Sequence, residues 1–242
     1  MKKISISLLA AFLFLFSASS FANDVYEITV YHFKDAQQGI TLDTYLQTAY
    51  LPALHRKNIK SVGVFKPITN DTASDKIIYV IVPYHSFEEI VNMPKELMQD
   101  NLYKTAGETY LNADYKNPPY TRMENIILEA FPLAPQLTIP QLTSPKADHI
   151  YELRSYESPT LELSEKKMAM FNTGGEIQIF NRLKFNPVFY AKVISGSHMP
   201  NFMYMPIFDN VEQRDAQWKV FGNDPQWKEI SADPKNENKV SV

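Results

Sequence analysis

The stretch that decides the fold opens with His149-Ile150-Tyr151-Glu152-Leu153-Arg154-Ser155-Tyr156 and runs to Ile230. Its first eight residues have the pattern of a β-strand. A helix with lysine and methionine follows over about 167–180, then two short strand patterns at 187–190 and 200–205. The stretch closes on an aromatic helical region that contains Trp218 and Trp227. This order predicts an α+β unit in which a sheet is backed by two helices.

The first half of the chain follows the same order. Strand patterns occur at 25–32, 62–65, 77–82 and 122–131, and the apolar spacing of 41–57 predicts a helix. Ser86 and Glu89 form a capping-box pattern for a second helix. We expect Pro94 to break that helix, with a further helix from Pro94 to Leu111. The predicted order is β-α-β-β-α-β.

Matching short motifs recur in the two halves at a spacing of about 125 residues, which is well above solenoid periods. Tyr26-Glu27 returns as Tyr151-Glu152, and Ile78-Tyr79 returns as Met203-Tyr204. The capped helix at Ser86 has its counterpart at Asp209-x-x-Glu212. A tandem duplication of one ferredoxin-like unit explains these matches, and chance alignment of short motifs is the alternative.

The second copy lacks a clear counterpart of strand 122–131. After residue 233 only Lys239-Val240-Ser241-Val242 could begin a strand. A unit without its last strand leaves an open sheet edge. Either another copy covers that edge, or the sequence stops short of its natural end.

Prolines at 132, 135, 140 and 145 predict an extended linker between the halves. The expected organisation is therefore a signal peptide at 1–22, a first repeat at 23–131, a linker at 132–147 and a second repeat at 148–242.

The N-terminus has the features of a secretory signal peptide. Lys2 and Lys3 precede an apolar segment at 8–16, and Ser20-Phe21-Ala22 places small residues at a cleavage site. We expect cleavage after Ala22, a periplasmic or secreted location, and no stable membrane span afterwards. An N-terminal membrane anchor is the alternative. The chain has no cysteine, which excludes a lipoprotein anchor, disulfides and thiolate chemistry.

The composition excludes several classes of function. The 242 residues carry a formal net charge of −3 and no basic run, so we expect no nucleic-acid partner. None of the five histidines stands at metal-ligand spacing, and no G-x-S-x-G element is present. We therefore predict no metal site and no cofactor.

Glu152, Arg154 and Tyr156 lie two residues apart and therefore on one face of a strand, with Tyr151 and Leu153 on the other. A carboxylate, a guanidinium and a phenol in a row could hold a polar ligand or supply acid–base groups. The alternative is a solvent-facing edge, with Tyr151 and Leu153 in the core.

Arg214, Trp218 and Phe221 recur at helical spacing, so Arg214 could stack on Trp218. Asp224-Pro225 is a cap followed by a first-turn proline, before Trp227. These aromatic residues either line a cleft or pack the helix on the sheet.

The second half resembles the NIPSNAP family. The motifs that carry the resemblance are Lys167-x-x-Met170-Phe171-x-x-Gly174-Gly175-Glu176-Ile177-x-Ile179-Phe180, Asn186-Pro187-Val188-Phe189, Met199-Pro200-Asn201-Phe202-x-Tyr204-Met205 and Arg214-x-x-x-Trp218-x-x-Phe221-x-x-Asp224-Pro225-x-Trp227. In the first half, Leu51-Pro52-Ala53-Leu54 and Ile59-x-x-Val62-Gly63-Val64-Phe65 resemble the same family. The resemblance implies a ferredoxin-like, dimeric α/β-barrel fold, which two tandem repeats could form within one chain. It implies no reaction.

Two hypotheses of function follow. The first is an exported, non-enzymatic module that binds an unidentified small molecule or protein and could form a homo-oligomer. The second is a small-molecule enzyme, monooxygenase-like or haem-using, by analogy with other families on this barrel fold. The candidate residues are Glu152, Arg154, Tyr156, Tyr190, His198, Arg214 and Trp218.

Overall fold

The computed structural model describes residues 23–236, so the expected signal peptide at 1–22 and the possible strand residues 239–242 lie outside the described residues. The first repeat has the predicted β-α-β-β-α-β order. Its elements are β1 (Val25–Phe33), α1 (Ala36–Tyr45), the π-helical turn η1 (Leu46–Tyr50), α2 (Leu51–Arg56), β2 (Gly63–Phe65), β3 (Lys76–Tyr84), α3 (Phe87–Leu97), α4 (Asn101–Ala106), α5 (Glu108–Leu111) and β4 (Arg122–Ala130).

The second repeat follows an extended segment that crosses between the two halves. In that segment, Leu137 N–H donates to Asp24 at the start of the first repeat, and Thr138 N–H donates to the Val188 carbonyl in the second. The elements are η2 (Lys146–Asp148), β5 (Ile150–Tyr151), β6 (Arg154–Glu157), α6 (Leu161–Phe171), α7 (Glu176–Arg182), β7 (Pro187–Ser195), β8 (Asn201–Phe208), α8 (Val211–Asn223), α9 (Pro225–Ala232) and η3 (Pro234–Asn236).

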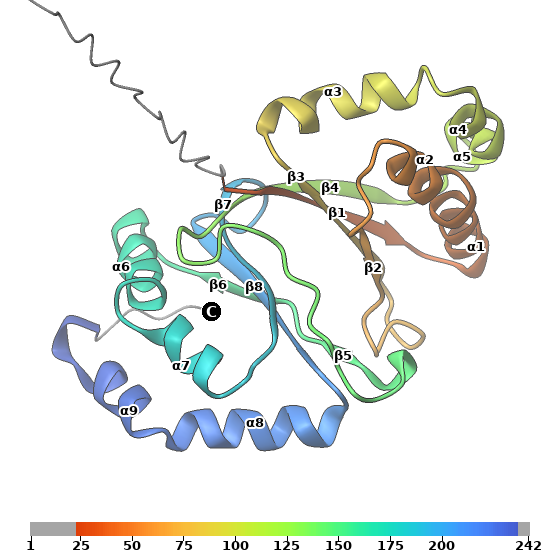
Figure 1. Cartoon of the computed structure of the whole chain (residues 1–242). Coiled ribbons are helices and arrows are strands. Elements are labelled where there is room, and N and C mark those ends of the chain that lie inside the picture. The colour runs from red at the N-terminus through yellow and green to blue at the C-terminus, as the bar shows by residue number, and fades with distance from the viewer. Residues whose placement is uncertain (1–22, 237–242) are drawn as a thin grey trace, which may run out of the picture.

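All strands of the described residues join one antiparallel sheet in the order β2-β3-β1-β4-β7-β8, with β5 and β6 both paired to β8. The pairing of β4 with β7 connects the two ferredoxin-like repeats. The sheet curls, and each repeat carries its helices on the outer face (Figure 1). This is the predicted dimeric α/β-barrel arrangement within one chain. In the described part, no strand follows α9, so the barrel is open between β2 and β6.

The strand predicted at 149–156 is divided into β5 and β6, and a proline on the neighbouring strand explains the interruption. Glu152 N–H donates to the Pro206 carbonyl over 3.0 Å. Pro206 has no N–H with which to return the bond. The register is nevertheless the same on both sides, since Tyr151 lies opposite Ile207 and Arg154 lies opposite Tyr204. Side chains therefore alternate without a break along residues 150–157.

Several predicted helix bounds were wrong. The helical segment expected at 41–57 begins at Ala36, and the helix expected from Pro94 to Leu111 is replaced by the end of α3 followed by α4 and α5. The helix expected over about 167–180 is divided into α6 and α7. Helix α3 runs through Pro94 to Leu97. Only its last turn follows the proline, so few main-chain bonds are affected. Helix α8 is capped by Asn210 and not by Asp209: the Asn210 side chain accepts from Gln213 N–H over 2.8 Å. The predicted cap at Asp224, with a proline in the first turn of α9, is present.

The two faces of the sheet build separate cores. Residues of both repeats meet on the inner face, in a cluster of Tyr26, Ile28, Val30, Ile81, Ile126, Leu128, Ala130, Phe189, Ala191, Val193, Met203 and Met205. On the outer face, the helices of the second repeat cover Phe131, Met168, Phe171, Ile177, Ile179, Phe180, Phe185, Tyr190, Phe202, Tyr204, Phe208 and Phe221. Burial of this apolar area is the main stabilising term.

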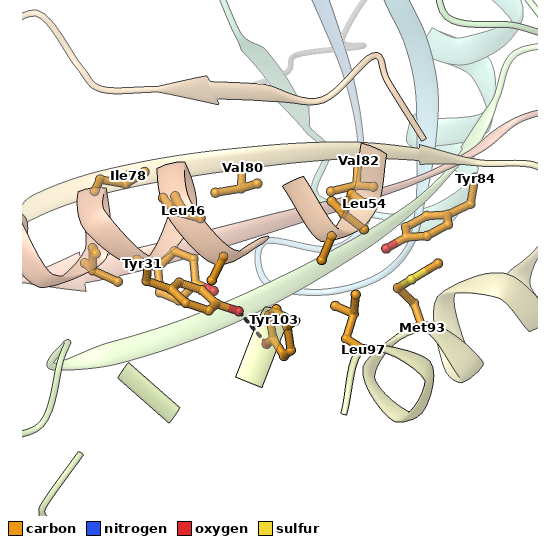
Figure 2. Packing of buried hydrophobic residues seen from close by; sticks show 14 of the residues in the cluster. Tyr31, Leu46, Leu54, Ile78, Val80, Val82, Tyr84, Met93, Leu97 and Tyr103 are labelled. Atoms are coloured by element: carbon orange, nitrogen blue, oxygen red, sulfur yellow. Dashed lines mark hydrogen bonds between the residues drawn. The ribbon is translucent and has the colours of Figure 1, made fainter. Parts of the chain in front are cut away.

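The outer core of the first repeat is shown in Figure 2. Ile78, Val80 and Val82 of β3 alternate toward Leu46 and Leu54 of the covering helical segment. Each of these side chains is nearly or fully buried. A strand period of two on β3 and a helical period on residues 42–54 therefore produce one continuous apolar layer.

Leu128→Ala tests whether the inner core holds the repeats together. Leu128 is fully buried on β4, opposite Val193 of β7. We expect the free energy of unfolding to fall by about 2–5 kcal/mol, measured by urea denaturation, because a cavity opens where the repeats meet. Leu133→Ala is the matched control, since Leu133 is 51% exposed and its loss should cost less than about 0.5 kcal/mol. Equal effects of the two substitutions would contradict this account of the core.

Candidate functional site

The row of Glu152, Arg154 and Tyr156 faces the helices of the second repeat and not the solvent. Arg154 and Tyr156 lie opposite Tyr204 and Phe202 of β8, whose side chains belong to the helix-covered core. On the other face, Leu153 packs against the inner core, while Tyr151 remains 41% exposed. The alternation along this strand therefore places the polar row in an aromatic layer.

Glu152 is the centre of a hydrogen-bond network. Its carboxylate accepts from Arg154 Nη1 at 2.5 Å, from Arg214 Nε at 2.7 Å and Nη2 at 3.1 Å, and from Trp218 Nε1 at 3.0 Å. Burial by itself raises the pKa of the Glu152 carboxyl, but hydrogen bonds from Arg214, Trp218 and Arg154 outweigh burial and lower the pKa below its ordinary value. Glu152 is therefore an ionised anchor that orients both arginines.

Arg154, and not Arg214 as we predicted, lies on the ring of Trp218. Its guanidinium carbon is 4.4 Å from the centroid of that ring and 5.6 Å from the centroid of Tyr156. Arg214 instead donates hydrogen bonds to Glu152 and Asp215. The Arg154 side chain is 30% exposed, yet its buried Nε has no hydrogen-bond partner in the described part of the chain.

Lys167 and Glu176 form a buried ion pair beside this network. The Lys167 Nζ is 3.5 Å from a carboxylate oxygen of Glu176, and Glu176 is 1% exposed. Burial raises the pKa of the Glu176 carboxyl to about 7, although the positive charges of Lys167 and Arg154 act in the opposite direction. The Lys167 ammonium also lies 5.3 Å from the Tyr156 ring centroid and 5.6 Å from that of Trp227.

A glycine pair between α6 and α7 makes this ion pair possible. Gly175, which caps α7, has a φ of 101°, a conformation that favours glycine. A Cβ atom on Gly174 would stand 2.5 Å from the Met170 carbonyl oxygen. The chain can therefore turn tightly, and Glu176 at the start of α7 is brought back to Lys167 on α6.

Hydroxyl groups of two tyrosines continue the cluster. Tyr156 Oη and Tyr204 Oη lie 3.0 Å apart. Tyr190 stacks on Tyr204, with ring centroids 5.6 Å apart and planes 18° from parallel. Tyr190 Oη is buried and has no hydrogen-bond partner among the described residues.

Of the residues singled out in the sequence, Glu152, Arg154, Tyr156, Arg214 and Trp218 lie together, and Tyr190 lies in the adjacent aromatic layer. His198 does not join them. It sits in the β7–β8 turn with a side chain 64% exposed and its Nδ1 3.5 Å from Glu157.

Sequence reasoning missed Lys167, Glu176 and Tyr204 as members of the site. The only signal was a lysine and a glutamate among the apolar positions of the family motif.

The second half matches a known family. Residues 151–241 match the NIPSNAP family, which the resemblance indicated. No curated protein matches the chain.

Two solved structures are similar over most of their length. A provisionally assigned monooxygenase from Lactobacillus acidophilus NCFM aligns with a TM-score of 0.52 at 10% identity, covering 86% of each chain. A second one, from Fusobacterium nucleatum, aligns with a TM-score of 0.52 at 8% identity, covering 89% of this chain and 88% of the other. At such low identity the similarity shows the fold alone.

Within residues 23–236, no helix is long and apolar enough to cross a membrane. Over the same residues, no three metal-ligating side chains converge. The polar groups of the cluster are guanidinium, ammonium, carboxylate and phenol groups.

Glu176→Gln tests the buried carboxyl. Because the pKa is raised in the folded protein, the native state retains a proton that the unfolded state releases between pH 4.5 and about pH 7. The free energy of unfolding should therefore fall as pH rises through this window, by up to about 1.4 kcal/mol per pH unit. In the Glu176→Gln variant, the free energy of unfolding measured in urea should no longer fall with pH through this window. Glu88→Gln, at an exposed position, is the control and should retain it. An unchanged slope in Glu176→Gln would contradict the assignment.

Proposed function

We propose that the chain is an exported binding module whose second repeat holds a small anion with an apolar or aromatic body. The observation that carries the proposal is Arg154. Its guanidinium is fixed by Glu152 and supported by the Trp218 ring, and the side chain is 30% exposed. Such a pre-oriented donor suits a carboxylate or phosphate oxygen.

The charge balance of the cluster favours an anion. Arg154, Arg214 and Lys167 face the carboxylates of Glu152 and Glu176, while Asp215 contacts Arg214 from the exposed side. With the pKa of Glu176 at about 7, this carboxyl is largely protonated below neutral pH, which leaves an excess of positive charge. An anion would therefore bind more tightly as pH falls through 7, since protonation of Glu176 removes a repelling charge.

The geometry favours binding over catalysis because most polar groups of the cluster already form hydrogen bonds with one another. Glu152 accepts from four donor atoms, and the Tyr156 and Tyr204 hydroxyls pair. These contacts hold the side chains of the cluster in fixed positions, as a rigid recognition site requires.

Arg154→Met tests the proposal with benzoate as probe and benzamide as its neutral counterpart. Trp218 fluorescence and calorimetry should report saturable binding of benzoate and weaker binding of benzamide, because only benzoate pairs with the guanidinium. The substitution should weaken benzoate about tenfold, the effect expected for one charge-assisted hydrogen bond. Arg56→Met is the control, since Arg56 pairs with Asp100 in the first repeat. Equal affinities for the two probes, or no saturable binding, would contradict the proposal.

The export part of the proposal rests on the N-terminal sequence. Native mass spectrometry of the chain isolated from the periplasm or medium should give the mass of residues 23–242, without the 22 residues before the expected cleavage site. The same spectrum would also detect any co-purified ligand and any homo-oligomer by mass. Recovery of the full-length chain in the membrane fraction would favour the N-terminal anchor instead.

An enzyme is the second candidate, and Glu176 is the observation that favours it. A buried carboxyl with a pKa near 7, next to Lys167, is suited to take up and release a proton at neutral pH. If a co-purified compound changes mass on incubation with the wild-type protein but not with the Glu176→Gln variant, the result supports an enzyme. A compound that stays unchanged with both proteins supports the binding module.

A further inference from the structure

Helix α3 of the first repeat carries two apolar rows, and only one of them packs in the core. Met93 and Leu97 are buried in the outer core of the first repeat. The second row is exposed to solvent and consists of Phe87, Val91, Pro94 and Met98. The exposed fractions of Phe87, Val91 and Met98 are 44%, 76% and 52%. Apolar side chains gathered on one exposed face indicate an interaction surface.

The four residues of the second row form one continuous line, which we call the α3 stripe. They recur at steps of four, three and four positions, and side chains at this spacing lie above one another on a helix. Met98, which caps α3, still has the backbone conformation of an α-helix, so the stripe continues to the end of α3. The arginine cluster is in the second repeat, so the α3 stripe is a separate feature of the molecule.

Two charged residues lie along one side of the α3 stripe. Glu88 and Lys95 are seven residues apart, so they stand on the same flank of the helix, about two turns from each other. Both are exposed, and neither forms an ion pair within residues 23–236. On the next row of the helix, by contrast, Glu96 pairs with Lys57 at 2.7 Å. One unpaired negative charge and one unpaired positive charge therefore border the stripe, near its opposite ends.

The α3 stripe is complementary to itself under a two-fold rotation. Its outer residues, Phe87 and Met98, and its inner residues, Val91 and Pro94, have the same midpoint along the helix, between positions 92 and 93. When two α3 helices pack antiparallel about an axis through this midpoint, Phe87 of each copy lies beside Met98 of the other. Val91 and Pro94 meet in the same way. A methionine sulfur beside an aromatic ring is a favourable contact.

The flanking charges match in the same arrangement. Glu88 and Lys95 have their midpoint between positions 91 and 92, within one residue of the midpoint of the stripe. In an antiparallel pair with a two-fold axis, the same flank of both helices lies on the same side of the pair. Glu88 of each copy therefore approaches Lys95 of the other, and two ion pairs of opposite charge form. A parallel pair would place these flanks on opposite sides and leave the charges apart.

We propose that two copies of this chain form a dimer through the α3 stripe, with the two α3 helices antiparallel about a two-fold axis. The partner is a second copy of the chain because the stripe and its flanking charges share nearly the same centre, as self-association about a two-fold axis requires. A single helix pair is at the low end of interface sizes, so the dissociation constant should be on the order of 10 μM.

Sedimentation velocity of the purified protein tests the proposal. From about tenfold below to about tenfold above that constant, the sedimentation coefficient should rise from that of a monomer to that of a dimer. Val91→Glu should abolish dimerisation, because it places a charge in the middle of the apolar contact. Ile68→Glu is the matched control, since Ile68 is 85% exposed and lies outside α3, and it should dimerise like the wild type. A monomer at every concentration, or dimerisation unchanged in Val91→Glu, would overturn the proposal.

Charge reversal tests the antiparallel arrangement itself. Lys95→Glu should weaken the dimer about threefold to tenfold, because two carboxylates then face each other at both ion-pair positions. The double variant Glu88→Lys/Lys95→Glu restores opposite charges at both positions and should recover the wild-type affinity. Circular dichroism confirms that each variant is folded, which the exposure of both positions favours. A double variant as weak as Lys95→Glu, or a Lys95→Glu variant with wild-type affinity, would contradict the two-fold pairing.

Discussion

The pairing of β4 with β7 is the interaction on which the rest of the structure depends. It joins the last strand of the first repeat to the third strand of the second repeat, through partners such as Leu128 and Val193. Because main-chain bonds continue across this junction, two small sheets become one curled sheet with a shared inner core. The register shift between Ile127 and Leu128 lies at the same place, and such irregularities increase bend and twist.

The two faces of this sheet have different chemistry. The outer face of the second repeat holds charged groups that aromatic rings surround, with Glu152 and Glu176 as its carboxylates. Burial raises the pKa of both carboxyls. At Glu152 four hydrogen bonds outweigh burial and lower the pKa, whereas at Glu176 the lysine at 3.5 Å does not, and the pKa stays raised. The inner face is apolar in its middle.

The fold was largely predictable because it follows from local periods and from an order of elements that recurs in the two halves. The alternation along 25–32, the nearly continuous apolar run at 77–82 and the helical spacing of 41–57 correspond to strands and a helical segment in the structure. Where a predicted helix end was wrong, the local sequence explains the difference. Pro94 falls near a helix end and is tolerated, and Asn210 offers the same capping oxygen one residue after Asp209. The interruption opposite Pro206 could not be seen without knowing which strands pair.

The sequence by itself determined the α+β class, the duplicated order and the shared face of Glu152, Arg154 and Tyr156, because these depend only on the backbone periods of strands and helices. The tertiary structure alone decided that this face meets helices, that Arg154 rather than Arg214 covers Trp218, and that Lys167 pairs with Glu176. It also brought Phe65 to Tyr151 from opposite repeats. Each of these contacts joins segments whose approach is set by packing of the whole sheet, which no local pattern encodes.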